Sequence, residues 1–81
     1  MLYNVMAVVV SYRSKNSSEI QKVFTKFGCL IKVRLGLHEA GDVCSEEGLI
    51  ILQLAGEKEE IEEFRKELNE IEGIRAKCME V

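Results

Sequence analysis

Proline and tryptophan are absent from this chain, and only three of its 81 residues are cysteines. Without proline, neither a native cis-prolyl bond nor a proline-rich docking segment can form. The cysteines, Cys29, Cys44 and Cys78, are an odd number and contain no CxxC pair, which argues against a disulfide framework and against a tetrahedral zinc ribbon. Cys29 and Cys78 are therefore expected to act as small buried hydrophobic side chains.

A dense run of basic residues is also missing from the first half. Residues 1–40 carry six Lys/Arg against two Glu, whereas residues 41–81 carry five Lys/Arg against twelve Asp/Glu, and the net charge is −3. Surfaces that bind duplexes usually show a concentrated basic stripe, but the basic residues of the first half stand singly. We therefore expect no direct binding of nucleic acid.

No segment is long enough to predict a membrane-spanning helix, because the apolar run at residues 1–10 is only about half the length that a bilayer requires. That run also lacks the basic region and the cleavage site of a secretory signal. We therefore expect a cytoplasmic protein with reduced thiols and no contact with a membrane.

Hydrophobic periodicity predicts six elements. Apolar side chains recur at helical spacing in residues 16–28 and 57–72. In the first helix, Asn16 and Glu19 have the spacing of a capping box, and Gly28 is expected to end the helix in a left-handed conformation. Apolar runs predict strands at four further segments, residues 3–12, 29–37, 49–55 and 74–81. From Ile31 to Leu37 apolar and polar residues alternate, which predicts a strand with one solvated face.

The order of these elements predicts one α+β domain over residues 1–81. Its expected fold is a ferredoxin-like βαββαβ sandwich, in which a four-stranded antiparallel sheet of order 4-1-3-2 carries both helices on one face. The uncovered face would present Leu49, Ile51 and alternate residues of the first strand, a large apolar patch for a monomer. We therefore expect a homo-oligomer, a dimer or a tetramer, packed sheet to sheet or edge to edge.

Two residues near the end of the second strand could carry chemistry. Nucleophilic catalysis needs a Ser or Cys beside a base, but nothing orients a third member beside His38 and Cys44, so we expect no enzymatic activity. Imidazole and thiolate ligands suit nickel, zinc or copper, and a neighbouring subunit could supply more of them. Two interpretations compete with a metal site. One is that residues 39–48 form a solvated connection that binds no metal, and the other is that the chain is a purely structural protein-interaction subunit. The sequence identifies no cofactor.

Several short motifs resemble those of a known family. They are Phe27-Gly28, Arg34-Leu35-Gly36-Leu37, Ile50 to Gly56 and Gly73-Ile74. With them the chain resembles, over nearly its whole length, the small family of iron-only hydrogenase system regulators. The resemblance implies a ferredoxin-like, ACT-like domain, close to the ligand-binding half of nickel-responsive repressors, and a regulatory role in an anaerobic hydrogenase system.

The resemblance also implies where a ligand would bind. The nickel-responsive relatives bind metal through His and Cys near the second and third strands, and the spacing of His38 and Cys44 matches part of that site, although Gly36 stands where a companion His is expected. A small-molecule effector, for which an amino acid is one candidate, is expected in a groove between subunits, with Arg34, Gly36, His38 and Gly41 as candidate ligand-binding residues. Because no residues remain for a DNA-binding segment, we expect a sensor that acts through a DNA-binding partner protein.

Overall fold

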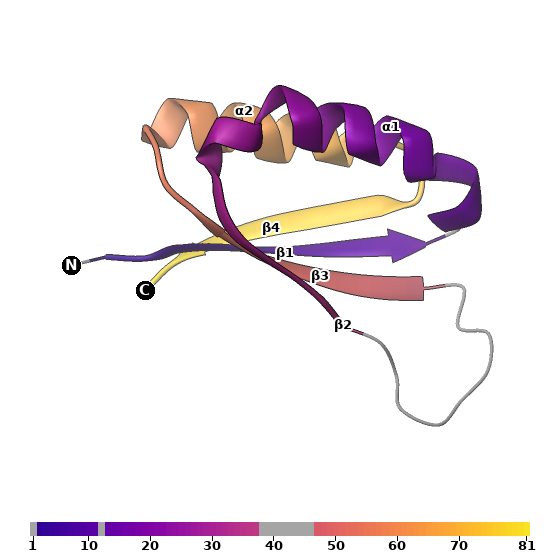
Figure 1. Cartoon of the computed structure of the whole chain (residues 1–81), viewed down its shortest axis with the longest axis horizontal. Coiled ribbons are helices and arrows are strands. Elements are labelled where there is room, and N and C mark those ends of the chain that lie inside the picture. Colours follow the sequence, from indigo (N-terminus) through magenta and orange to yellow (C-terminus); the bar gives the residue numbers. More distant parts are fainter. Residues whose placement is uncertain (1, 12, 38–46) are drawn as a thin grey trace.

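The computed structural model describes residues 2–11, 13–37 and 47–81 of the chain. Its elements follow the expected order (Figure 1). In chain order they are β1 (Asn4–Ser11), α1 (Arg13–Lys26), the short 3-10 turn η1 (Gly28–Leu30), β2 (Ile31–Leu37), β3 (Glu47–Leu54), α2 (Lys58–Asn69) and β4 (Ile74–Glu80).

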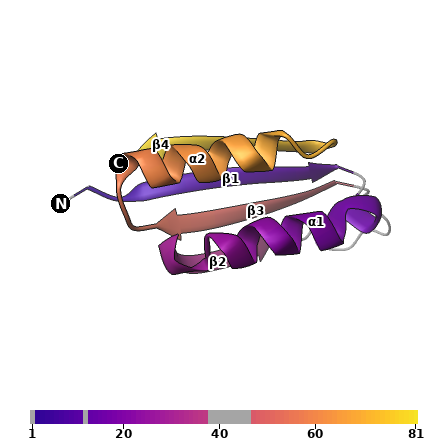
Figure 2. The ribbon, with the colours of Figure 1, turned by 90° about the horizontal axis from the view of Figure 1, so that it is seen from above.

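The four strands form one sheet of order β2-β3-β1-β4, with every neighbouring pair antiparallel. This is the predicted order read from the opposite edge, so the α+β ferredoxin-like fold is confirmed. Both helices lie on the same face of the sheet, with α2 over the β1–β4 half and α1 over the β2–β3 half (Figures 1 and 2).

The core fills the space between the sheet and the two helices. Its five largest fully buried side chains come from both layers, and they are Phe64, Met6, Leu52, Leu68 and Val8. Burying side chains of this size is the main stabilising contribution to a small domain.

Aromatic rings join the two helices across the top of this core. The Phe64 ring contacts Phe24 edge to face, with ring centroids 5.9 Å apart, and stacks on Phe27 at 5.0 Å. Beside them, the Lys26 ammonium forms an ion pair with Glu67 at 2.7 Å, which raises the pKa of Lys26. The rings fix the distance between α1 and α2, and this exposed ion pair adds little to stability.

The ends of α2 are formed by local contacts. The Glu57 backbone N–H donates to the Glu60 carboxylate at 3.2 Å, which satisfies one free donor at the helix start. The helix ends at Asn69, three residues before its predicted end, and Gly73, with φ of 84°, lies in the turn that leads into β4.

The predicted ends of the first helix are wrong. The helix begins at Arg13, which places Asn16 inside it and excludes the predicted cap. Arg13 and Lys15 are good helix formers, so the helix extends toward β1. Gly28 has no positive φ and instead opens η1, where the Leu30 N–H bonds the Phe27 carbonyl at 2.9 Å. This tighter turn inserts Leu30 into the core.

Candidate functional site

The face of the sheet opposite the helices is largely apolar over β2, β3 and β1 and carries two basic residues on β4, and we call it the open face. Side chains opposite one another in the strand register lie on the same face, and the row through Ala7 consists of Lys77, Ala7, Ile51 and Leu35. The adjoining rows add Val5, Val9, Val33, Leu49, Gln53, Arg75 and Met79. The predicted placement of Leu49, Ile51 and alternate residues of the first strand on this face is confirmed, although these residues are half-buried rather than fully exposed.

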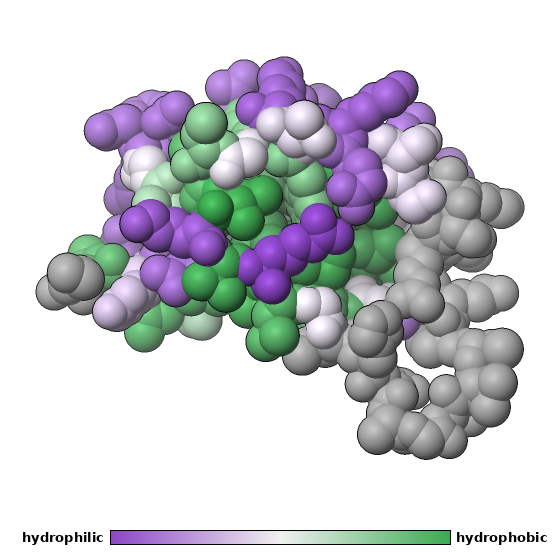
Figure 3. Space-filling view, in the orientation of Figure 1, coloured by the Kyte–Doolittle hydropathy of each residue, from purple (hydrophilic) through white to green (hydrophobic). Residues whose placement is uncertain are grey.

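None of the described residues outside the sheet covers the open face. On the central strands, neighbouring side chains leave Val5, Ala7 and Val9 half-buried. At the edges Val33 and Leu35 are each 53% exposed and Met79 is 60% exposed. Figure 3 shows hydrophilic side chains gathered over the helices and hydrophobic ones lower down, along the sheet. Contiguous apolar surface of this kind is uncommon on monomeric proteins.

A bulge in β2 explains why Val33 and Leu35 belong to the open face. Ile31 pairs with Leu54 and Val33 with Gln53, so one extra residue is accommodated between them. The alternation predicted for this strand is therefore present only after the bulge. There the apolar side chains lie on the open face and the polar ones on the helix side, which is the reverse of the predicted strand with a solvated polar face. Ile31 packs against the core, whereas the apolar side chains that follow it are exposed.

The polar side of β2 faces the helices. The Arg34 guanidinium lies over the Phe24 ring, 4.8 Å from its centroid, and covers the edge of the core. Gly36 lies on the same side of the strand, and a Cβ added there would meet nothing within 4 Å. Arg34 and Gly36 are thus brought together, on the side of the sheet away from the open face.

The other predicted site residues, His38, Gly41 and Cys44, lie outside the described residues, and the effector and metal sites stay predictions. Within residues 2–11, 13–37 and 47–81, no three His, Cys, Asp or Glu side chains gather as metal ligands would.

Charged side chains occupy the border of the open face. Arg75 and Lys77 lie on the edge strand β4, and Arg75 forms an ion pair with Glu47 at 3.8 Å across the end of β1. The Ser11 hydroxyl donates to the same Glu47 carboxylate at 3.4 Å. The centre of the face is left to apolar residues and Gln53.

The outer edge of β4 is blocked by a side chain that sequence reasoning missed. The Ala76 N–H donates to the Asn69 side-chain oxygen at 2.8 Å, and the Asn69 amide donates to the Ala76 carbonyl at 2.9 Å. The asparagine takes the place of a neighbouring strand at this point. An asparagine at the end of a helix carries no sequence signal for this role.

The two described cysteines are exposed free thiols, so the expectation that they are buried is wrong. Cys29 lies in the surface turn η1 and Cys78 on the edge strand β4, where neither is enclosed by the core. Partial burial raises the pKa of the Cys78 thiol, the Glu62 carboxylate raises it further, and Arg65 opposes both.

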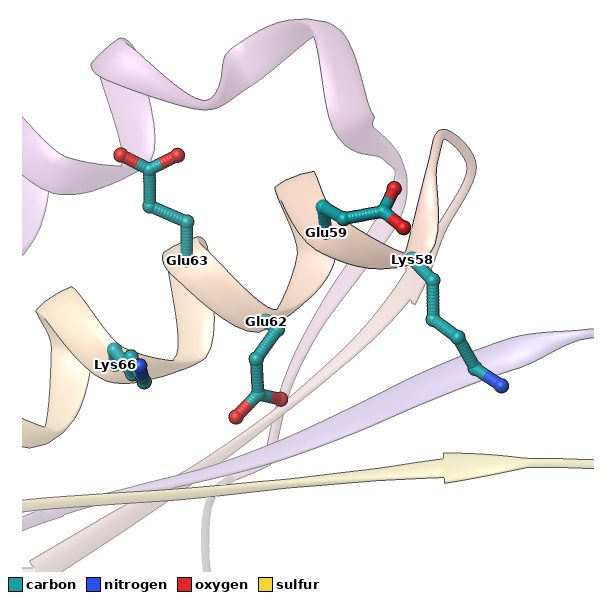
Figure 4. A pocket seen from close by; sticks show the side chains of 5 residues that line it. All are labelled: Lys58, Glu59, Glu62, Glu63 and Lys66. Carbon is teal, nitrogen blue, oxygen red and sulfur yellow. The ribbon is translucent and has the colours of Figure 1, made fainter.

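A shallow hollow lies on the outer side of α2. Its lining consists of Lys58, Glu59, Glu62, Glu63 and Lys66, and Figure 4 shows these side chains projecting from the one helix in different directions. No second element lines the hollow. It therefore does not enclose a ligand as binding pockets do.

Within the described part of the chain, neither helix has the length and apolar character needed to cross a bilayer.

Comparison with known proteins supports the fold. A scan against protein-family models finds no match, and a comparison with curated proteins finds none either. Among solved structures, the chain is similar to the uncharacterized protein TM1266 from Thermotoga maritima, with 21% sequence identity, a TM-score of 0.83 and alignment over 100% of this chain and 99% of that one. At this level of identity the likeness establishes that the two proteins share one fold over their whole aligned length.

Proposed function

We propose that this chain is a small regulatory or effector-sensing module that acts as a homo-oligomer assembled through its open face, without catalytic chemistry of its own. The observation that carries the proposal is the apolar surface over β2, β3 and β1, which extends to Met79 on β4, with Val33, Leu35 and Met79 more than half exposed. A second copy of the chain would remove this surface from water, which is the main driving force of association.

The regulated system is proposed to be an iron-only hydrogenase system. The support comes from the motifs at residues 34–37, 50–56 and 73–74, which resemble those of its regulators. The module would transmit its signal to a separate DNA-binding protein.

The effector, which the sequence led us to expect in a groove between subunits, is proposed instead to bind at the edge of β2, because Arg34 and Gly36 lie on the side of the sheet away from the open face. Arg34 supplies a cationic fork that matches a carboxylate, and the open space beside Gly36 allows a ligand to approach the backbone. An amino acid offers the matching anionic group.

The assembly is tested by one substitution on the open face and one matched control. Ile51→Lys introduces a charge at the centre of the face, while Thr25→Lys adds the same charge on the exposed surface of α1. The wild type and Thr25→Lys are expected to share one oligomer mass in light scattering, and Ile51→Lys to fall to the 9.2 kDa monomer with an unchanged circular dichroism spectrum. Equal masses for all three proteins would contradict assembly through this face.

Effector binding is tested by thermal shift with the amino acids as probes. Stabilisation of the wild type by one of them, absent in Arg34→Ala, supports the proposed site. Absence of any shift counts against an amino-acid effector. Retention of nickel or zinc in equilibrium dialysis by the wild type, lost in His38→Ala/Cys44→Ala, would favour the metal-sensing alternative.

A further inference from the structure

The size, charge and side-chain shape of the open face favour one way of packing two copies, and this packing rests on the assembly proposed above. Strands of seven and eight residues in a four-stranded sheet give a face of roughly 25 Å by 19 Å, or about 480 Å² per subunit before side-chain relief is counted. Two such faces reach the roughly 1,000 Å² that a specific interface requires. The area therefore suffices for a dimer of this chain.

Symmetry limits the choices. A two-fold axis that brings two identical sheets face to face lies in the plane between them, and aligned sheets cross at about 30°. The axis then runs either along the strands or across them. An axis along the strands places β4 over β2 of the partner and β1 over its β3, whereas an axis across the strands places every strand over its own copy.

Charge separates these two arrangements. Lys77 and Arg75, the basic residues of the open face, both lie on β4. With the axis across the strands, β4 faces β4 and brings Lys77 toward its own copy, which is unfavourable because Lys77, unlike Arg75 with Glu47, has no ion pair among the described residues. With the axis along the strands, the two β4 strands lie at opposite edges of the dimer, and the aliphatic stem of Lys77 covers the partner's exposed Leu35.

Side-chain size favours the same arrangement. On the open face β1 carries the small or short side chains Val5, Ala7 and Val9, while β3 carries Leu49 and Ile51. Facing layers interdigitate best when small residues meet large ones. An axis along the strands places Ala7 against Ile51 of the partner subunit, whereas the other axis sets small against small and large against large.

We propose that two copies of this chain pack open face to open face about a two-fold axis parallel to the strands, so that β4 of each subunit lies over β2 of the other. Rotation about such an axis leaves each residue at the same position along the strand direction. Residues of one row in one subunit therefore face residues of the same row in the other. Leu35 and Lys77 share the row of Ala7, so Leu35 of one subunit lies over Lys77 of the other.

Thiol cross-linking of mixed variants tests this geometry. Leu35→Cys and Lys77→Cys are made separately in a chain whose three cysteines are replaced by serine, refolded together, and treated with a cross-linker about as long as the ~10 Å between packed sheets. Both positions are exposed, so the fold is expected to persist. Val33→Cys with Met79→Cys, which share the row of Val5, provides a second pair.

A covalent dimer that forms in the mixed sample, and not with either variant alone, is the expected result. Cross-linking of each variant with itself would overturn the inference in favour of an axis across the strands, and the homo-oligomer would stand. A dimeric mass without cross-linking of either pair would also overturn it. A monomeric mass would instead refute the proposed assembly itself.

Discussion

At the residue scale, the asparagine that ends α2 caps the edge strand β4 at Ala76, a role that no sequence pattern predicted. Asn69 satisfies the outward N–H and carbonyl of Ala76 with both polar atoms of its side chain. It therefore blocks strand addition at the β4 edge in the way that a neighbouring strand would.

The loss of this side chain has a local signature. Asn69→Ala leaves both Ala76 groups to water or unpaired and is expected to lower the free energy of unfolding by about 1–2 kcal/mol. Backbone hydrogen exchange at Ala76 should accelerate, because its N–H loses its acceptor. Gln21→Ala, an amide-to-alanine change on the exposed side of α1, is the control and should leave that exchange rate unchanged. Unaltered protection of Ala76 in Asn69→Ala would contradict the edge role.

The Cys78 thiol gives a second prediction at this scale. Its raised pKa comes from partial burial and then from Glu62, so the reactive thiolate is scarce at neutral pH. Glu62→Gln removes a negative neighbour, which lowers the pKa and moves the pH profile of Cys78 alkylation to lower pH. Mass spectrometry of iodoacetamide-treated protein measures this profile. Glu63→Gln is the matched control, and identical profiles in both variants would refute the assigned cause.

At the element scale, hydrophobic periodicity identified the four strands and two α-helices of the described residues but not their local irregularities or the short turn η1. The stripe through Ile61, Phe64 and Leu68 places α2 correctly because burial of that face dominates its stability. The bulge between Ile31 and Val33 inserts one residue without a compositional signal, and it decides which side of β2 faces the helices. The sequence therefore predicts the alternation of this strand but not which face of the sheet its apolar side chains occupy.

Gly56 shows how a junction between elements depends on one residue. It has φ of 142°, and an added Cβ would lie 2.5 Å from the Leu30 Cδ2 atom in the core. Gly56→Ala is therefore expected to cost about 1–3 kcal/mol in urea unfolding, through backbone strain and displacement of Leu30. Gly28→Ala, whose Cβ would meet nothing within 4 Å, should be neutral or slightly stabilising. Equal stability of the two variants would contradict this account.

At the scale of the whole molecule, the sheet order could be predicted because right-handed crossovers leave few arrangements for a βαββαβ chain. The open face followed from that order and from the apolar residues on both sides of β1 and β3. For the candidate effector site, only the types of residue near β2 could be predicted, and not their arrangement. Its position relative to the interface depends on the bulge, which sets Arg34 and Gly36 on the helix side of the sheet.

The central claim is that a second copy of this chain covers the open face. Sedimentation equilibrium of the unmodified protein over a dilution series tests it most directly. At micromolar concentration the mass is expected to be a whole-number multiple of 9.2 kDa and to fall toward that value on dilution. A particle of 9.2 kDa at every concentration, stable and free of aggregation, would contradict the account.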